Sequence, residues 1–173
     1  YIRRILNANI YDLVIETPIQ PAPLLSKRLG NDVLLKREDL QPVFSFKLRG
    51  AFNNMLTREV LDAGIVAASG GNHGAAVAYA ATKLGHKSRI YVPASIAKEE
   101  KLRRMRDFGG EVILTEGTVG ECMDEYAAYA ATSGALSVHP YDTVPTLTGQ
   151  GTVAREIEAQ MTAVEMGGID TVL

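Results

Sequence analysis

A lysine and a glycine-rich turn are the features of this sequence best suited to chemistry. Lys47 stands in Ser45-Phe46-Lys47-Leu48-Arg49-Gly50, near the expected start of a helix. The positive end of a helix dipole disfavours the protonated amine. Only a neutral lysine amine attacks an aldehyde to form a Schiff base, so a lowered pKa would make Lys47 a candidate nucleophile. Taken alone, the motif fits an exposed helical lysine without a role at least as well.

The second feature is the turn Ser69-Gly70-Gly71-Asn72-His73-Gly74, which follows an expected strand and opens an expected helix. Small residues leave backbone N–H groups free to hold an anion. Glycine also permits close approach of a ligand and a positive φ. A tight strand-to-helix turn without a ligand is the alternative interpretation of this motif.

The elements that must position these residues alternate along the chain. We expect helices at residues 1–14, 45–57, 72–84, 96–108, 118–132 and 146–162, and strands at 33–35, 65–68, 90–92, 112–114, 136–138 and 171–173. Pro18, Pro21 and Pro23 predict a loop. Short apolar strands separated by helices indicate an α/β fold with parallel sheets covered by helices. Ligands of such sheets bind beyond the C-terminal ends of strands, where the turn at 69–73 is expected to lie.

In this order and spacing, the motifs resemble those of fold-type II pyridoxal-phosphate (PLP) enzymes, the tryptophan synthase β-like family. Lys36–Pro42 and Ser45–Ala51 are similar to the signature of threonine dehydratases. Ser69–Gly74 is similar to the substrate loop of these enzymes, and Phe108–Val112 and Gly149–Thr152 match later landmarks. The resemblance covers nearly the whole chain, and threonine/serine dehydratases (ammonia-lyases) are the members that it fits best.

The resemblance implies a role for each matching residue. Lys47 would carry PLP as a Schiff base and later move the Cα proton, Phe46 would pack by the cofactor ring, and Asn72 would hydrogen-bond its phenolic oxygen. The carboxylate pocket for the amino-acid substrate would be lined by Ser69, Gly70, Gly71, Asn72 and His73. The implied reaction is β-elimination, in which the 3-hydroxyl leaves and a 2-oxo acid and ammonia result. It would serve amino-acid metabolism, including isoleucine biosynthesis.

Two departures from the family pattern leave alternatives open. Gly70 stands where related serine racemases carry a serine as a second acid/base, which favours elimination over racemisation. A β-replacement synthase or a racemase remains the alternative enzyme.

The family binds the PLP phosphate with a glycine-rich loop after a strand similar to Asp170–Leu173, where this sequence ends. We therefore expect an N-terminal fragment in two lobes that is inactive alone: a small α/β domain at 67–143 and an incomplete larger PLP-binding domain at 1–66 and 144–173. A non-enzymatic folding unit or amino-acid-binding remnant is the other alternative.

Net charge, apolar runs and cysteine content limit the kinds of binding partner and cellular compartment that we expect for this protein. A net charge of −2 disfavours nucleic acid, because phosphate neutralisation needs a basic surplus. No apolar run reaches the ~20 residues that span a bilayer, and the charged start Tyr1-Ile2-Arg3-Arg4 without a long apolar run after it leads us to expect no signal peptide. The single cysteine, Cys122, fits a reducing compartment and is expected as a small buried residue. We expect a cytoplasmic homo-oligomer that acts on a small amino acid, with neither a membrane partner nor a metal.

Two further features carry open alternatives. The charge run from Glu99 to Arg106 has opposite charges four residues apart, which predicts a solvated helix face, with a phosphate-binding patch as the alternative. Tyr141 follows an expected strand end at His139-Pro140. It would either edge the cofactor or pack as an aromatic in the seam between the two lobes.

Overall fold

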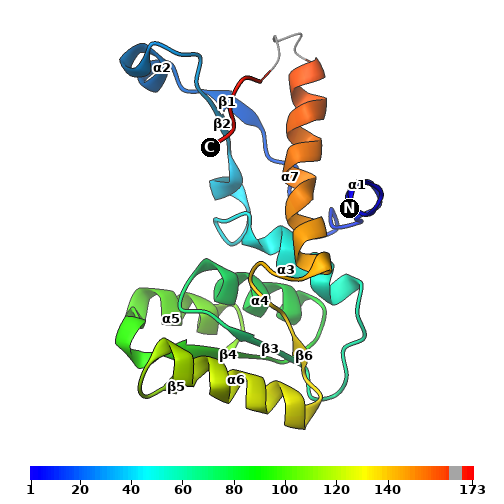
Figure 1. Ribbon diagram of the computed structural model, residues 1–173, viewed down its shortest axis with the longest axis vertical. Coiled ribbons are helices and arrows are strands. Elements are labelled where there is room, and N and C mark those ends of the chain that lie inside the picture. The colour runs from blue at the N-terminus through cyan, green and yellow to red at the C-terminus, as the bar shows by residue number, and fades with distance from the viewer. Residues whose placement is uncertain (164–168) are drawn as a thin grey trace.

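A four-stranded parallel sheet forms the lower half of the molecule in Figure 1. The computed structural model describes residues 1–163 and 169–173. The strands are β3 (Ile65–Ala68), β4 (Ser88–Pro93), β5 (Glu111–Thr115) and β6 (Leu136–Ser137), and they lie in the order β5-β4-β3-β6. The strands expected at 65–68, 90–92, 112–114 and 136–138 are therefore found, with ends shifted by one or two residues.

Helices cover both faces of this sheet, as its short apolar strands require. Helices α4 (Asn72–Lys83) and α5 (Glu99–Asp107) share a core with Ile65 and Ala67. Helix α6 (Val119–Ser133) shares a second core with Val66, because alternate residues of a strand point to opposite faces. Cys122 is buried in that second core, as expected. The chain steps outward from β3 to β5 over one face and returns to β6 over the other, as right-handed crossovers demand.

The upper half of Figure 1 holds the remaining elements except η2, which follows β4 in the lower half. Strands β1 (Ile19–Pro21) and β2 (Leu34–Lys36) form an antiparallel pair, with helix α2 (Pro23–Leu29) between them. Short elements complete the chain: α1 (Ile2–Leu6), η1 (Glu38–Leu40) and η2 (Ala94–Ile96). Helix α3 (Lys47–Leu56) packs against both α4 and the upright helix α7 (Val144–Ala163), and so joins the two halves.

Helices α3 and α7 approach closely at two glycines, Gly50 and Gly149. A Cβ placed on Gly149 would clash with the carbonyl oxygen of Arg49 and would lie 2.7 Å from the Cα of Gly50. A Cβ on Gly50 would in turn lie 2.9 Å from a methyl carbon of Thr146. The backbones can approach this closely only because both positions are glycine.

A cluster of buried charges lies beside this crossing. Arg49 is fully buried and donates from Nε and Nη2 to the two carboxylate oxygens of Glu38, at 2.8 and 2.7 Å. Its Nη2 also donates to Glu156 of α7 at 2.8 Å. Glu156 forms a further ion pair with Lys36 at 2.7 Å and accepts a hydrogen bond from Tyr11 at 2.8 Å. Burial alone would raise the pKa of Glu156, but the hydrogen bonds from Arg49, Lys36 and Tyr11 hold it below its usual value.

Three sequence expectations for the outer segments are wrong. The helix expected at 1–14 ends at Leu6, and the chain turns at Asn7 so that Ile10 and Val14 reach the core outside any helix. Of the three prolines expected to mark a loop, only Pro18 lies outside regular elements: Pro21 ends strand β1 and Pro23 opens helix α2, where a missing N–H costs nothing. Residues 171–173 form no strand, because no strand among the described residues pairs with them.

The described residues include no helix long and apolar enough to cross a membrane.

Replacing Gly149 with alanine should destabilise the protein. The new methyl group would meet helix backbone, which cannot rotate away, so the free energy of unfolding should fall by about 2 kcal/mol or more. Gly120→Ala is the matched control, since its Cβ would have only one neighbour, at 3.6 Å, in the exposed first turn of α6. Chemical denaturation of both variants measures the difference, and equal stability would show that the crossing can relax.

Candidate functional site

Three segments meet at the C-terminal end of the parallel sheet. Strands β3 and β6 are neighbours, so the turn after β3 (69–71) and the loop after β6 (138–143) leave the sheet side by side. His73 bonds through Nε2 to the carbonyl oxygen of Val138 at 2.9 Å. Lys47, at the start of α3, donates from Nζ to the carbonyl oxygen of Pro140 at 3.0 Å. The loop after β6 therefore holds the lysine and the glycine turn together, at the end where parallel sheets bind ligands.

Lys47 is half-buried, and burial lowers the pKa of its amine. The direction agrees with the sequence prediction, although the cause there was the helix dipole. The ring of Phe46 lies beside it, with its centroid 5.2 Å from Nζ, and remains exposed. An amine with a lowered pKa, one carbonyl partner and an exposed aromatic neighbour can accept a carbonyl compound from solvent.

The glycine turn presents unused backbone donors. Helix α4 begins after Gly71 without a side-chain cap, so the N–H groups of its first turn have no side-chain acceptor. The hydroxyl of Ser69 accepts a hydrogen bond from the N–H of Gly71 at 3.2 Å, which shapes the turn. Neither Gly70 nor Gly71 has a positive φ, so the expectation of left-handed backbone does not apply here. Close approach matters at Gly74, where a Cβ would lie 2.9 Å from the carbonyl oxygen of Ser69.

The predicted carboxylate-pocket residues divide into two groups. Ser69, Gly70, Gly71 and Asn72 lie in the turn and are accessible to solvent. His73 is buried, and burial lowers its pKa to about 4, with a smaller contribution from the charge of Lys47. The neutral ring donates to Val138 and braces the loop after β6. The buried side chain of His73 therefore supports the loop and does not line a solvent-accessible pocket wall.

The loop after β6 was only partly anticipated. Tyr141 is exposed rather than packed in a seam, and its ring contacts His139 edge-on at 4.6 Å. The backbone N–H groups of Tyr141 and Asp142 both donate to Nδ1 of His139, which fixes the loop. The contact of Lys47 with Pro140 uses a main-chain carbonyl, so no residue type in the sequence signals it.

Phe44 is a second feature that the sequence did not indicate. It has φ of 58°, a left-handed conformation that bulky residues rarely adopt and that costs about 1–3 kcal/mol. Its exposed ring lies under the guanidinium of Arg104, at 5.5 Å from the ring centroid. This strained residue comes three positions before Lys47, so it sets the path by which the chain enters α3.

The charge run on α5 is only partly a solvated face. Glu99 pairs with Arg106 at 3.1 Å, and neither expected pair four residues apart is among the ion pairs of the described residues. Arg103 is exposed, but Lys101 and Arg104 are half-buried. Arg104 lies over Phe44, and Lys101 lies beside Gly71, so both face the candidate site.

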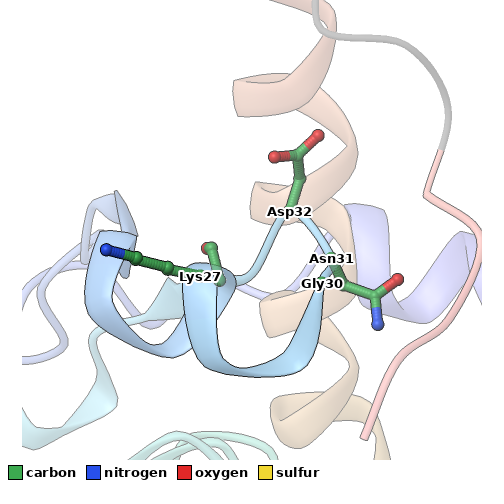
Figure 2. Close-up of a pocket in the computed structure, with 5 residues that line it drawn as sticks. Lys27, Gly30, Asn31 and Asp32 are labelled. Carbon is green, nitrogen blue, oxygen red and sulfur yellow. The ribbon is translucent and has the colours of Figure 1, made fainter.

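A hollow of 330 Å³ at the end of α2 is a poor competitor for the functional site. Figure 2 shows its labelled side chains, Lys27, Asn31 and Asp32, pointing apart rather than toward one point. The hydroxyl of Ser26, which also lines it, is bonded to the N–H of Val33 and to the carbonyl of Ala22. Figure 1 places α2 at the far end of the molecule from the four-stranded sheet. Across residues 1–163 and 169–173 no group of His, Cys, Asp and Glu residues could hold a metal ion.

Comparison with known proteins identifies the family. A family model described as "Pyridoxal-phosphate dependent enzyme" matches residues 10–173. The chain belongs to this family of PLP-dependent enzymes. The fold-type II resemblance drawn from Lys47 and the glycine turn is thereby confirmed, as is the α/β fold with a parallel sheet flanked by helices.

Two curated relatives of this chain are named threonine dehydratases, and one similar solved structure is a serine racemase. "Threonine dehydratase 1 biosynthetic, chloroplastic" of Solanum lycopersicum is 43% identical over 93% of this chain. "L-threonine dehydratase biosynthetic IlvA" of Corynebacterium glutamicum is 45% identical over 91%. The chain spans 27% and 37% of the lengths of these two relatives. The solved structure of maize serine racemase matches this chain with a TM-score of 0.87 and 30% identity. The match covers 93% of this chain and 50% of the racemase chain.

The buried histidine of this PLP-enzyme fold predicts a pH dependence. Because the pKa of His73 falls from 6.5 to about 4 on folding, the unfolded chain binds the proton more tightly. The free energy of unfolding therefore has its full value above pH 6.5 and decreases as the pH falls through 4. The total decrease due to His73 is about 3 kcal/mol at most. Unfolding measured by denaturant from pH 7 to pH 4.5 should show this slope. His73→Gln should make the free energy of unfolding less dependent on pH, and His86→Gln, which replaces a half-buried histidine, should not. An equal pH dependence in both variants would contradict its assignment to His73.

Proposed function

We propose that this chain supplies the lysine and the substrate-carboxylate turn of a PLP-dependent enzyme that eliminates water from threonine or serine. The products would be a 2-oxo acid and ammonia. The observation that carries the proposal is the joining of Lys47 and the turn at 69–73 to one loop, residues 138–140, at the ligand-binding end of the sheet. Membership of the family and relatives named threonine dehydratases support the choice of reaction.

The residues around Lys47 suit the cofactor. The half-buried amine with its lowered pKa would hold the PLP aldehyde carbon, Phe46 would cover the ring, and Asn72 would bond to the phenolic oxygen. When bound, PLP supplies an electron sink for the negative charge left at Cα of the substrate. Once the substrate amine had displaced it from the cofactor, Lys47 would take the proton from Cα, and its contact with the carbonyl of Pro140 would hold the free amine in place during that step.

The turn would orient the substrate by its carboxylate. The side chains of Ser69 and Asn72 and the free N–H groups at the start of α4 would hold the anion, and the helix dipole favours it there. Gly70 and Gly71 would leave room for its approach. A fixed carboxylate would set the Cα–H bond toward Lys47, which is the positioning that β-elimination requires.

A racemase or a β-replacement synthase is the alternative enzyme within the family. The likeness to maize serine racemase supports the racemase. Gly70 argues against racemisation, because it has no hydroxyl to act as a second acid/base. The side chains of Ile96 and Val92 lie 3.3 and 3.5 Å from where its Cβ would be, so apolar groups border this position. Rates with threonine, serine and O-acetylserine, together with loss of optical activity, would separate these reactions.

The division into a small domain at 67–143 and a larger one at 1–66 and 144–173 is part of this proposal. It is supported by the four-stranded sheet, three of whose strands lie within the first range, while β3 (Ile65–Ala68) crosses its boundary. A cytoplasmic location, homo-oligomeric assembly and a place in isoleucine biosynthesis are also proposed. The biosynthetic names of both dehydratase relatives support the last of these.

Replacing Lys47 tests the proposed function directly. In the full-length protein, borohydride reduction in the presence of PLP should label Lys47, and Lys47→Ala should lower the elimination rate by a factor of about 10³ or more. Lys83→Ala is the matched control, because Lys83 is exposed in the last turn of α4, where its ammonium lies over the ring of Tyr79. Labelling of Lys83 or Lys36 instead, or full activity in Lys47→Ala, would reject the assignment.

A further inference from the structure

Lys101 of helix α5 lies beside the glycine turn. A Cβ placed on Gly71 would have one neighbour within 4 Å, the ammonium nitrogen of Lys101 at 3.8 Å. The side chain is half-buried, so the charge stands at the border of the turn rather than in open solvent. Lys101 is far from the turn in sequence, and its helix follows the next strand of the sheet, β4.

The charge of Lys101 has no anionic partner in the part of the chain that the structure describes. No ion pair there involves Lys101, and no side-chain hydrogen bond does either. The neighbouring start of α4 is also positive, because its backbone N–H groups lack a side-chain cap. Two positive features at one border repel each other unless an anion lies between them.

The position of Lys101 is fixed by its neighbours on α5. Arg104, one turn further along, lies over the ring of Phe44, and Leu102 and Met105 are buried against the sheet. The helix therefore presents Lys101 and Arg104 on the same side, toward the segment that leads into Lys47. Arg103 points to solvent on the other side. The charge run is thus divided into a solvated face and a face that borders the site.

We propose that Lys101 binds the α-carboxylate of the amino-acid substrate, together with the turn at 69–72. This inference rests on the proposed function, because it uses the same carboxylate site. It adds a positive side chain to a pocket otherwise built from neutral groups and backbone. Lys101 is then a determinant of specificity: it favours amino acids with a free carboxylate over their neutral amides.

The test compares a carboxylate ligand with its neutral amide in the full-length protein loaded with PLP. Alanine and alaninamide have no group to eliminate, so their dissociation constants report binding without turnover. In Lys101→Met the dissociation constant for alanine should rise about tenfold or more, and that for alaninamide should change little. Lys101→Arg should keep most of the preference. Arg103→Met, which removes an exposed charge from the same helix, should leave both constants unchanged.

Kinetics give a second readout. With threonine, Lys101→Met should raise KM by a similar factor and leave kcat nearly unchanged, because the carboxylate contact is made equally before and during the reaction. An equal loss of affinity for alanine and alaninamide would mean that Lys101 only supports the fold. Unchanged affinity for both would also overturn the inference while leaving the proposed function intact. If the unaltered protein bound neither PLP nor amino acids, the proposed function would fail, and this inference with it.

Discussion

Arg49 lies in the interior with its guanidinium bonded to two carboxylates that come from opposite ends of the chain. Glu38 belongs to the segment after β2, and Glu156 belongs to α7. Removing such charges from water costs several kcal/mol for each ion, and only near-complete pairing offsets this. Lys36 and Tyr11 complete the shell around Glu156. The arrangement specifies where three segments meet, because any displacement would leave a buried charge unpaired.

This cluster and the candidate site share one helix. Arg49 and Lys47 are two residues apart at the start of α3, so they project from different sides of it. One side is fixed by ion pairs to the upper half of the molecule, and the other reaches the loop after β6 in the lower half. The buried ion pairs of Arg49 fix the position of helix α3, and α3 in turn fixes the position of the Lys47 amine, which must stay accessible to solvent.

The sequence predicted the sheet because its strands and helices follow local rules, whereas the roles of the site residues rested on the resemblance to a family and stay a prediction. Solid apolar runs such as Ile65–Ala68 and glycine stops such as Gly85 mark the α/β alternation. The outer segment was harder, since Ile10 and Val14 have helical spacing yet reach the core from turns. The buried state of His73, the left-handed Phe44 and the approach of Lys101 all depend on which strands become neighbours. Tertiary contacts of this kind leave no mark in a single sequence.

The crossing of α3 and α7 limits how this protein can vary. A side chain on Gly149 would meet the backbone of α3, and a side chain on Gly50 would meet the side chains of Gln150 and Thr146 on α7, so a replacement at either position would push the helices apart. Such a separation would carry Lys47 with it, since the lysine belongs to one of the two helices. In a deep mutational scan we therefore expect single replacements at either glycine to be poorly tolerated. A replacement there would be recovered only together with compensating changes along the opposite helix.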